Sequence, residues 1–195
     1  SPLSQHRPPP LEGGLFKREW FKHVFVDRAP GGLLWCRGYD LAVSTKTDAD
    51  YTASFRVALD ENSGILYIDG GFRKRIEYPE QRKYVIERML EEKDTSHGIE
   101  KALHGQAFVQ DLQREVKLAH VSLAPVKAET DKLTRALPLA ARAEDGKVAL
   151  VRGPWNDEFI EEACSFPFGQ HDDQIDAVSL AVKMLTKGKR GKGGF

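Results

Sequence analysis

Residues 33–43 read LLWCRGYDLAV, an apolar run of the β-strand type that contains a single acid, Asp40. Two further runs of this type follow, TASFRVAL at 52–59 and GILYIDG at 64–70. The segment that joins them, DENSG, is typical of a hairpin turn. The three runs therefore predict an antiparallel beginning to a β-sheet, with Asp40 inside its first strand.

The apolar positions of the second half alternate between helical spacing and short strand-like runs. We predict helices over 79–90, 106–116, 130–143, 154–163 and 172–185, and strands over 97–100, 120–126 and 147–151. Pro138 is expected to interrupt the third of these helices, and Pro154 to stand at the first position of the fourth. A hairpin followed by strand–helix–strand crossovers indicates an α/β fold, with a mixed sheet flanked by helices.

The length of 195 residues suits one domain with an attached arm. Residues 1–14 are rich in proline, glycine and polar groups, so we interpret them as a linker or arm. Residues 188–195 contain basic residues and glycine but no acid, which is typical of a basic flexible tail. We expect the folded domain over 15–187.

The composition excludes several classes of protein. No run of 18 apolar residues exists, which excludes a membrane span, and Cys36 and Cys164 form no CxxC pair that would indicate a disulfide framework or a zinc ribbon. A reducing compartment is therefore expected. The 29 basic residues balance the 29 acidic ones, and zero net charge by itself argues against a nucleic-acid partner.

Acids stand at the ends of the predicted elements. A carboxylate inside an apolar strand, such as Asp40, is costly to bury unless it binds a metal or a strong donor. Glu100 ends the fourth predicted strand, and His171, Asp172 and Asp173 begin the last helix. If the first and fourth strands are neighbours, these acids converge at one edge of the sheet. Converging carboxylates repel unless divalent cations neutralise them, and oxygen ligands favour Mg²⁺ or Mn²⁺.

Each acid also has a purely structural interpretation. Asp172 or Asp173 can cap the last helix, and Glu100 taken alone is unremarkable. Asp48 and Asp50 are interpreted as solvated turn residues, with an outer metal contact as the alternative. The choice between Asp172 and Asp173 as a metal ligand stays open, although helical spacing places Asp172 nearer the apolar face.

Three segments resemble a known family. The segment RGYDLAVSTKTDADYTA (37–53) resembles the opening hairpin of the nuclease domain of large terminase subunits from tailed bacteriophages. The segment GQHDDQIDAVSLA (169–181) resembles its closing helix motif, and GGLFKREWF (13–21) resembles the link to the packaging ATPase. The resemblance extends over about 13–187 and implies a ribonuclease-H-like fold.

The resemblance implies a metal-dependent endonuclease that cuts concatemeric double-stranded phage DNA during genome packaging. By motif position, Asp40 would bridge two Mg²⁺ or Mn²⁺ ions, Glu100 would be the second acid, and Asp172 or Asp173 the last. His171 would be a ligand or a partner of a ligand. Water activated by the ions would then attack the phosphodiester in line, although the same acids also suit a single-metal variant.

The chain contains no GxxxxGK[ST] phosphate loop, so we expect the nuclease portion without ATPase activity. The resemblance further implies the terminase ATPase domain, the portal protein and the small terminase subunit as partners. It also implies action in the cytoplasm of the host cell.

Two groups of basic residues are candidates for contact with DNA phosphates. The first lies in a predicted loop over 71–83 and comprises Arg73, Lys74, Arg75, Arg82 and Lys83. The second comprises Lys127, Lys132 and Arg135, with Arg142, Lys147 and Arg152 near the next strand. The alternative for the second group is a solvated helix face of mixed charge.

Two other functions remain open. A Holliday-junction resolvase or a transposase-type nuclease would share the acids. A non-catalytic domain that docks a packaging partner would use the same acids as caps and turns.

Overall fold

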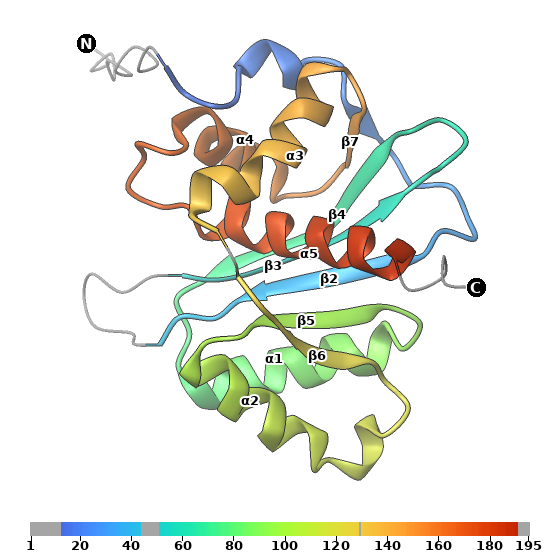
Figure 1. Ribbon diagram of the computed structural model, residues 1–195, viewed down its shortest axis with the longest axis vertical. Helices are drawn as coiled ribbons and strands as arrows, with labels where there is room; N and C mark the ends of the chain where they lie inside the picture. The colour runs from blue at the N-terminus through green and yellow to red at the C-terminus, as the bar shows by residue number, and fades with distance from the viewer. Residues whose placement is uncertain (1–12, 44–50, 129, 191–195) are drawn as a thin grey trace, which may run out of the picture.

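A computed structural model describes residues 13–43, 51–128 and 130–190. It shows a β-sheet between two layers of helices (Figure 1). The strands are β1 (Phe25–Val26), β2 (Trp35–Asp40), β3 (Thr52–Leu59), β4 (Leu66–Lys74), β5 (Ser96–Glu100), β6 (Leu123–Val126) and β7 (Val148–Val151).

The spatial order of the seven strands is β1-β7-β4-β3-β2-β5-β6. Among the described strands, β3 alone is antiparallel to its neighbours, and each remaining pair in the sheet is parallel. The carboxyl ends of β2, β4 and β5 therefore lie at the same edge, which we call the functional edge. The predicted α/β fold with a mixed sheet is confirmed.

The helices form the outer layers. They are α1 (Tyr78–Glu91), α2 (Leu103–Gln113), α3 (Lys132–Glu144), α4 (Asn156–Ser165) and α5 (Asp173–Arg190), with short 3₁₀ turns η1 (Arg18–Phe21) and η2 (Val116–Leu118). None of the described helices is long and apolar enough to cross a membrane.

The first layer consists of α3, α4 and α5. Its core joins Phe55 of β3 and Leu150 of β7 to Phe159 of α4 and Val178 of α5. Helix α5 packs across β2 and β3. Gly38 permits this approach, because a Cβ atom at that position would collide with the Ala177 carbonyl of α5.

The second layer consists of α1 and α2 on the opposite face. Its core packs Tyr39 and Ile99 of the sheet against Met89 of α1 and Phe108 of α2. Side chains alternate along a strand, so β2 directs Arg37 and Tyr39 into this layer and turns Gly38 and Asp40 toward α5. Arg37 and Asp40, three positions apart on β2, thus face opposite helix layers.

Several local predictions were wrong. Residues 71–74 belong to β4 and 78–83 to α1, so most of the predicted basic loop is regular structure. Strand β4 is prolonged because it pairs with β3 as far as Thr52↔Lys74, a long-range pairing that local composition does not signal. The sequence reading also missed β1, a short edge strand beside β7.

Two prolines act differently from expectation. Pro138 lies inside a continuous α3, because the buried Ala136, Leu139 and Ala140 anchor the helix on both sides of it. Proline removes one hydrogen bond of the helix and crowds the carbonyl four residues earlier, and the packing of α3 compensates this cost. Pro154 precedes α4, which begins at Asn156 after Trp155.

The predicted ends of the domain lie partly outside the described residues. Residues 1–12 and 191–195 are among those not described. Leu15 is anchored, since its N–H donates to the Phe166 carbonyl at 3.0 Å. Helix α5 continues to Arg190, three residues beyond the boundary that we expected for the domain.

Candidate active site

Two acids lie side by side on neighbouring strands at the functional edge. Strands β2 and β5 are parallel with Tyr39 opposite Ile99, which makes Asp40 and Glu100 the next neighbours in register. Both acids share the α5 face, because Gly38 and Gly98, two residues earlier, meet α5 side chains or backbone. The condition set from the sequence, that the first and fourth predicted strands be neighbours, is met.

The start of α5 brings further acids to this edge. Asp173 is its first residue and is 4% exposed, whereas Asp172 precedes the helix and its carbonyl accepts from the Asp176 N–H at 2.9 Å. Asp172 and Asp176 are four residues apart and therefore project from the same side of the helix. Sequence reasoning left Asp176 out of the candidate set, although its i+4 spacing from Asp172 was a usable signal.

A cleft of about 240 Å³ opens beside these acids. It is lined by Asp40 of β2, Glu100 of β5 and Asp176 of α5. Thr134 and Arg135 of α3 form another part of its wall. Three separate elements thus each contribute one carboxylate to a single cleft.

Two acids of the cleft, Asp40 and Asp176, have raised pKa values. Burial, together with the charges of Asp176, Asp173 and Glu100, raises the pKa of Asp40 well above its usual range. Burial also raises the pKa of Asp176 to about 6, with Asp172 adding to the rise and Lys132 and Arg135 opposing it. Perturbation of this kind clusters at functional sites.

Two cations from α3 contact these acids. The Lys132 ammonium donates to Asp172 Oδ2 at 2.8 Å and lies 3.3 Å from Asp176 Oδ2. Arg135 lies 3.4 Å from Glu100 Oε1 and 4.0 Å from Asp176 Oδ1. Both were predicted to face DNA, and the structure places them against the carboxylates of the cleft. Lys127, the third member of that group, also lines the cleft.

Asp173 does not line the cleft, although its charge acts on Asp40. Its Oδ2 is 3.9 Å from His171 Nδ1, and its charge acts on the neighbouring Glu162. Glu162 Oε2 accepts from the Ile175 N–H at 2.8 Å and so caps the first turn of α5. Burial, reinforced by Asp173, raises the pKa of Glu162 to about 7. Sequence reasoning missed Glu162, but its i+3 spacing from the buried Phe159 placed it on the inner face of α4.

The end of β4 carries a stack of aromatic and basic side chains. The Tyr51 ring lies 4.4 Å from the Arg73 guanidinium, 4.3 Å from that of Arg75 and 5.0 Å from the His171 ring. Arg73 turns toward α4, where it lies 3.5 Å from Glu158 and 3.7 Å from Glu162. Lys74 and Arg75 are exposed. Arg73, one of the predicted DNA contacts, is therefore already engaged with acids.

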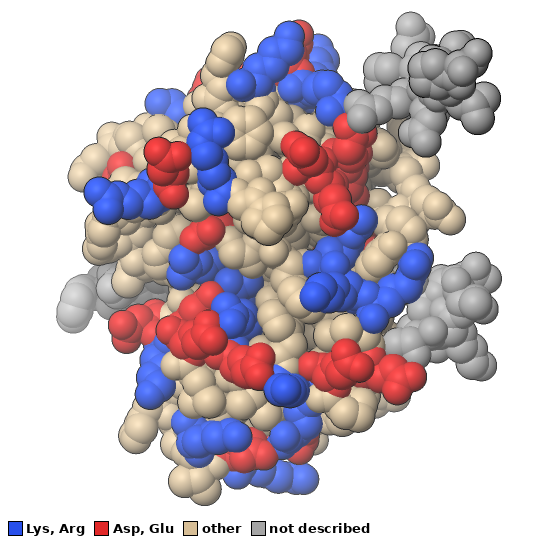
Figure 2. Space-filling model, turned by 180° about the vertical axis from the view of Figure 1, so that it is seen from behind, with Lys and Arg blue, Asp and Glu red and all other residues tan. Residues whose placement is uncertain are grey.

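The basic residues of α1 belong to the opposite layer. Arg82 pairs with Asp111 and Glu115 near the end of α2, and Lys83 lies 4.0 Å from Glu87. Figure 2 shows basic and acidic side chains gathered in separate adjacent patches on one face of the molecule. The zero net charge is therefore an average over patches and does not describe the local surface.

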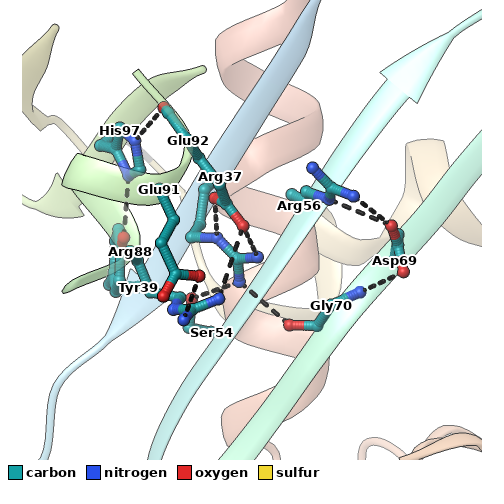
Figure 3. Close-up of polar contacts among 10 residues, drawn as sticks. All are labelled: Arg37, Tyr39, Ser54, Arg56, Asp69, Gly70, Arg88, Glu91, Glu92 and His97. Atoms are coloured by element: carbon teal, nitrogen blue, oxygen red, sulfur yellow. Dashed lines mark hydrogen bonds and ion pairs between the residues drawn. The ribbon is translucent and has the colours of Figure 1, made fainter. Parts of the chain in front are cut away.

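A second charged cluster lies on the other face of β2 (Figure 3). Arg37 is 1% exposed and makes a two-point contact with Glu92, with Nε–Oε2 and NH2–Oε1 both at 2.7 Å. Its NH1 donates to Ser54 Oγ at 2.9 Å and to the Gly70 carbonyl at 3.0 Å. Burial opposes ionisation of Glu92, but Arg37 overcomes it and holds the pKa of Glu92 below its usual value.

His97 extends this second cluster. Its Nδ1 lies 2.8 Å from the Tyr39 hydroxyl and its Nε2 lies 3.1 Å from the Glu92 carbonyl. Burial lowers the pKa of His97 to about 4, so the ring is neutral at pH 7. A neutral ring that donates from Nε2 accepts at Nδ1 from the Tyr39 hydroxyl, and the pair links β2 to β5.

The donor chemistry of the cleft suits a hard divalent cation. Asp40, Glu100, Asp172 and Asp176 offer carboxylate oxygens, the ligands that Mg²⁺ and Mn²⁺ prefer. Within the part of the chain that the structure describes, no three acidic, histidine or cysteine side chains lie close enough together to hold a metal ion. The donors therefore surround one cleft, but their oxygen atoms are farther apart than the ligands of a single metal ion. Asp48 and Asp50 lie outside the described residues.

Comparison with solved structures gives the same fold in several viral nucleases. The human cytomegalovirus terminase nuclease domain, Mn soaked and inhibitor bound, matches at a TM-score of 0.66 with 13% identity over 87% of this chain and 94% of that chain. The P22 large terminase nuclease domain matches at 0.63 with 13% identity over 90% and 93%. The large terminase nuclease of the thermophilic phage G20c, solved with bound zinc, matches at 0.56 with 18% identity over 81% and 85%.

No curated protein sequence matches the chain significantly. The family model of the terminase RNaseH-like domain matches residues 37–185, which include both the β2 hairpin and most of α5. The match contains every acid of the cleft. The chain belongs to the terminase RNaseH-like domain family.

Proposed function

We propose that this chain is a metal-dependent endonuclease that cleaves double-stranded concatemeric phage DNA during genome packaging. The observation that carries the proposal is the convergence of Asp40, Glu100 and Asp176 from three elements on one cleft. Burial, followed by repulsion from Asp176, Asp173 and Glu100, raises the pKa of Asp40, and a divalent cation would relieve this repulsion.

The carboxylates would hold Mg²⁺ or Mn²⁺, with two ions expected. Asp40 and Glu100 would supply ligands from the sheet, and Asp172 or Asp173 with Asp176 would supply them from α5. When bound, such ions activate water and stabilise the charge of the leaving oxygen in phosphodiester hydrolysis. The related G20c nuclease was solved with zinc and the cytomegalovirus domain was soaked with manganese, which supports divalent chemistry.

The DNA would approach along the functional edge. Strand β4 is parallel to β2, so Lys74 and Arg75 stand at the same edge as Asp40. Both side chains are exposed and can contact phosphates without reading bases. The substrate contact would therefore be sensitive to salt and largely independent of sequence.

The wider role follows from the family. We propose that the terminase ATPase domain, the portal protein and the small terminase subunit are partners, and that cutting takes place in the host cytoplasm. Because the chain carries no net charge, delivery of DNA would depend on the packaging motor rather than on bulk attraction.

The test is cleavage of supercoiled plasmid with Mg²⁺ or Mn²⁺, comparing wild type with Asp40→Ala. We expect the variant to lose about 10³-fold in rate, because several kcal/mol of transition-state stabilisation depend on the bound metal. Asp94→Ala serves as the matched control, since Asp94 is exposed in a turn at the opposite end of β5. Cleavage by Asp40→Ala at the wild-type rate would contradict the proposal that Asp40 holds a metal ion.

The same assay separates the other functions. Faster cutting of a four-way junction than of a duplex would favour a resolvase. Absence of cutting by the wild type, with either metal and either substrate, would favour a domain that only docks a packaging partner.

A further inference from the structure

The most unusual cation beside the cleft is Lys132, which contacts Asp176 of the cleft wall. It is the first residue of α3, where the partial positive charge of the helix N-terminus disfavours a lysine. Asp131 fixes this turn, because its Oδ1 accepts from the Thr134 N–H at 2.9 Å and its Oδ2 from the Thr134 hydroxyl at 3.0 Å. The start of α3 thus holds Lys132 where the helix N-terminus repels its charge. The negative charge that balances it must therefore come from outside α3.

That negative charge comes from α5. The Lys132 ammonium lies between the carboxylates of Asp172 and Asp176, at 2.8 Å and 3.3 Å from one oxygen of each. Two acids one helical turn apart would repel without a cation between them. Lys132 therefore supplies the charge that lets the two carboxylates face the same space.

Lys132 and Arg135 differ in how easily they can leave. Lys132 is 53% exposed, and its ammonium is a compact charge on a flexible stem that can turn into solvent. Arg135 is 17% exposed and contacts both Glu100 and Asp176. Of these two cations on α3, the lysine is the one that can be displaced without loss of packing.

We propose that Lys132 is a displaceable internal counter-ion, which neutralises Asp172 and Asp176 in the metal-free protein and competes with the divalent cation for them. The proposal rests on the proposed function, because it concerns the acids of the same cleft. A divalent cation between these oxygens and an ammonium at hydrogen-bond distance would repel each other, so binding of one requires departure of the other. Lys132 is in this sense a positioning residue that sets metal affinity.

The experiment is a calorimetric titration of Mn²⁺ into the metal-free chain without DNA. We expect Lys132→Met and Lys132→Gln to bind Mn²⁺ about tenfold more tightly than wild type, since removal of the competitor is worth on the order of one charge-pair contact. Lys132→Arg keeps the charge and should bind no more tightly than wild type. Lys93→Met removes the same charge from an exposed turn far along the sheet and should leave the affinity unchanged.

A second readout is thermal unfolding. In EDTA the Lys132→Met variant should unfold at a lower temperature than wild type, because two acids lose their counter-ion. At saturating Mn²⁺ its midpoint should rise by more than that of wild type. A merely structural lysine would lower both midpoints and leave the metal-induced rise unchanged.

The outcomes separate the two proposals. Equal or weaker Mn²⁺ binding by Lys132→Met, in a wild type that binds Mn²⁺ and cuts DNA, overturns the counter-ion role and leaves the nuclease intact. Binding by Lys132→Met alone supports the counter-ion role. If neither protein binds Mn²⁺, both proposals fail.

Discussion

Two charged clusters lie on β2, three residues apart and on opposite faces of the sheet. Arg37 is enclosed between the sheet and α1, and its hydrogen bonds to Glu92, Ser54 and Gly70 use donors from every nitrogen of the guanidinium. Asp40 faces α5 and a cleft, where burial and, after it, the neighbouring acids raise its pKa. The first cluster is matched in charge and geometry, whereas the second brings acids from three elements together and raises the pKa of two of them, Asp40 and Asp176.

The difference shows which charges stabilise the fold and which ones reduce its stability unless a ligand binds. A buried ion pair with complete hydrogen bonding contributes to a single packed arrangement, and breaking it is costly. An excess of buried acid reduces the stability of the metal-free fold and is retained where a ligand compensates it. The same strand therefore carries one cluster that supports the fold and one that the proposed chemistry requires.

Breaking the Arg37 cluster should have the larger effect on stability. We expect Arg37→Met to lower the free energy of unfolding by about 3 kcal/mol, because Glu92 is left buried without its partner. The folded state lowers the pKa of Glu92, so this contribution is present above the usual pKa of a glutamate and is lost as the pH falls through the lowered value. Urea denaturation at pH 7 and near pH 4 measures the loss of stability and its pH dependence. The difference in free energy of unfolding between wild type and variant should be smaller at the lower pH.

The control for this variant is Arg114→Met, since Arg114 is exposed after α2. Its effect should stay within about 0.5 kcal/mol. An Arg37→Met variant as stable as this control would mean that the matched cluster adds nothing to the fold.

Removing one acid from the Asp40 cluster should stabilise the metal-free fold, in contrast to breaking the Arg37 cluster. We expect Asp176→Asn to raise the unfolding free energy of the metal-free chain by about 1 kcal/mol at pH 7, after allowance for the contacts that Lys132 and Arg135 lose. The folded state raises the pKa of Asp176 to about 6, so the penalty on the wild type is complete above pH 6 and is lost as the pH falls from 6 to the usual aspartate value. The advantage of the variant should therefore vanish near pH 4.

Urea denaturation in EDTA at the two pH values tests this prediction, and Asp157→Asn, an exposed acid of α4, is the control. A loss of stability in Asp176→Asn at pH 7 would show that its contacts with α3 outweigh the repulsion, and the contrast with Arg37 would fail.

The smallest effect concerns the basic residues of β4. We expect Lys74→Gln and Arg75→Gln each to reduce the slope of duplex-DNA affinity against salt by about one, whereas Arg73→Gln leaves it unchanged, because Arg73 faces Glu158 and Glu162. Fluorescence anisotropy with a short duplex, in Ca²⁺ to prevent cleavage, measures the slope. Equal slopes for all three variants would show that engagement with acids does not decide which cation meets DNA.

The sequence predicted the mixed sheet because its signals are local. Alternating and apolar runs define strands, and the spacing of apolar residues defines helices, so most of the elements could be placed to within a few residues. The long β4 and the short β1 were missed because each depends on pairing with a distant strand. Pro138 was misjudged because packing of α3 against α5 outweighs the lost hydrogen bond and the local clash of the proline ring.

The candidate site was predicted in outline. Asp40 and Glu100 could be proposed because an acid at the end of an apolar strand is conspicuous, and their register confirms that they are neighbours. Asp176, Glu162 and the turn of Lys132 toward the acids depend on how α3 and α4 pack against α5. Helical spacing indicates a face, but not which helix will meet it.

The sequence alone determined most of the elements of this protein, the family resemblance and the strand acids, because each depends on residues close together in the chain. The tertiary structure decided which charges neutralise one another, because the crossovers bring residues that are far apart in the chain into contact. Lys132 and Asp172 are 40 residues apart, and Arg37 and Glu92 are 55 apart, yet each pair is joined by a hydrogen bond. The composition fixes 29 basic and 29 acidic residues. Only the fold decides which of them pair around Arg37 and which converge around the cleft.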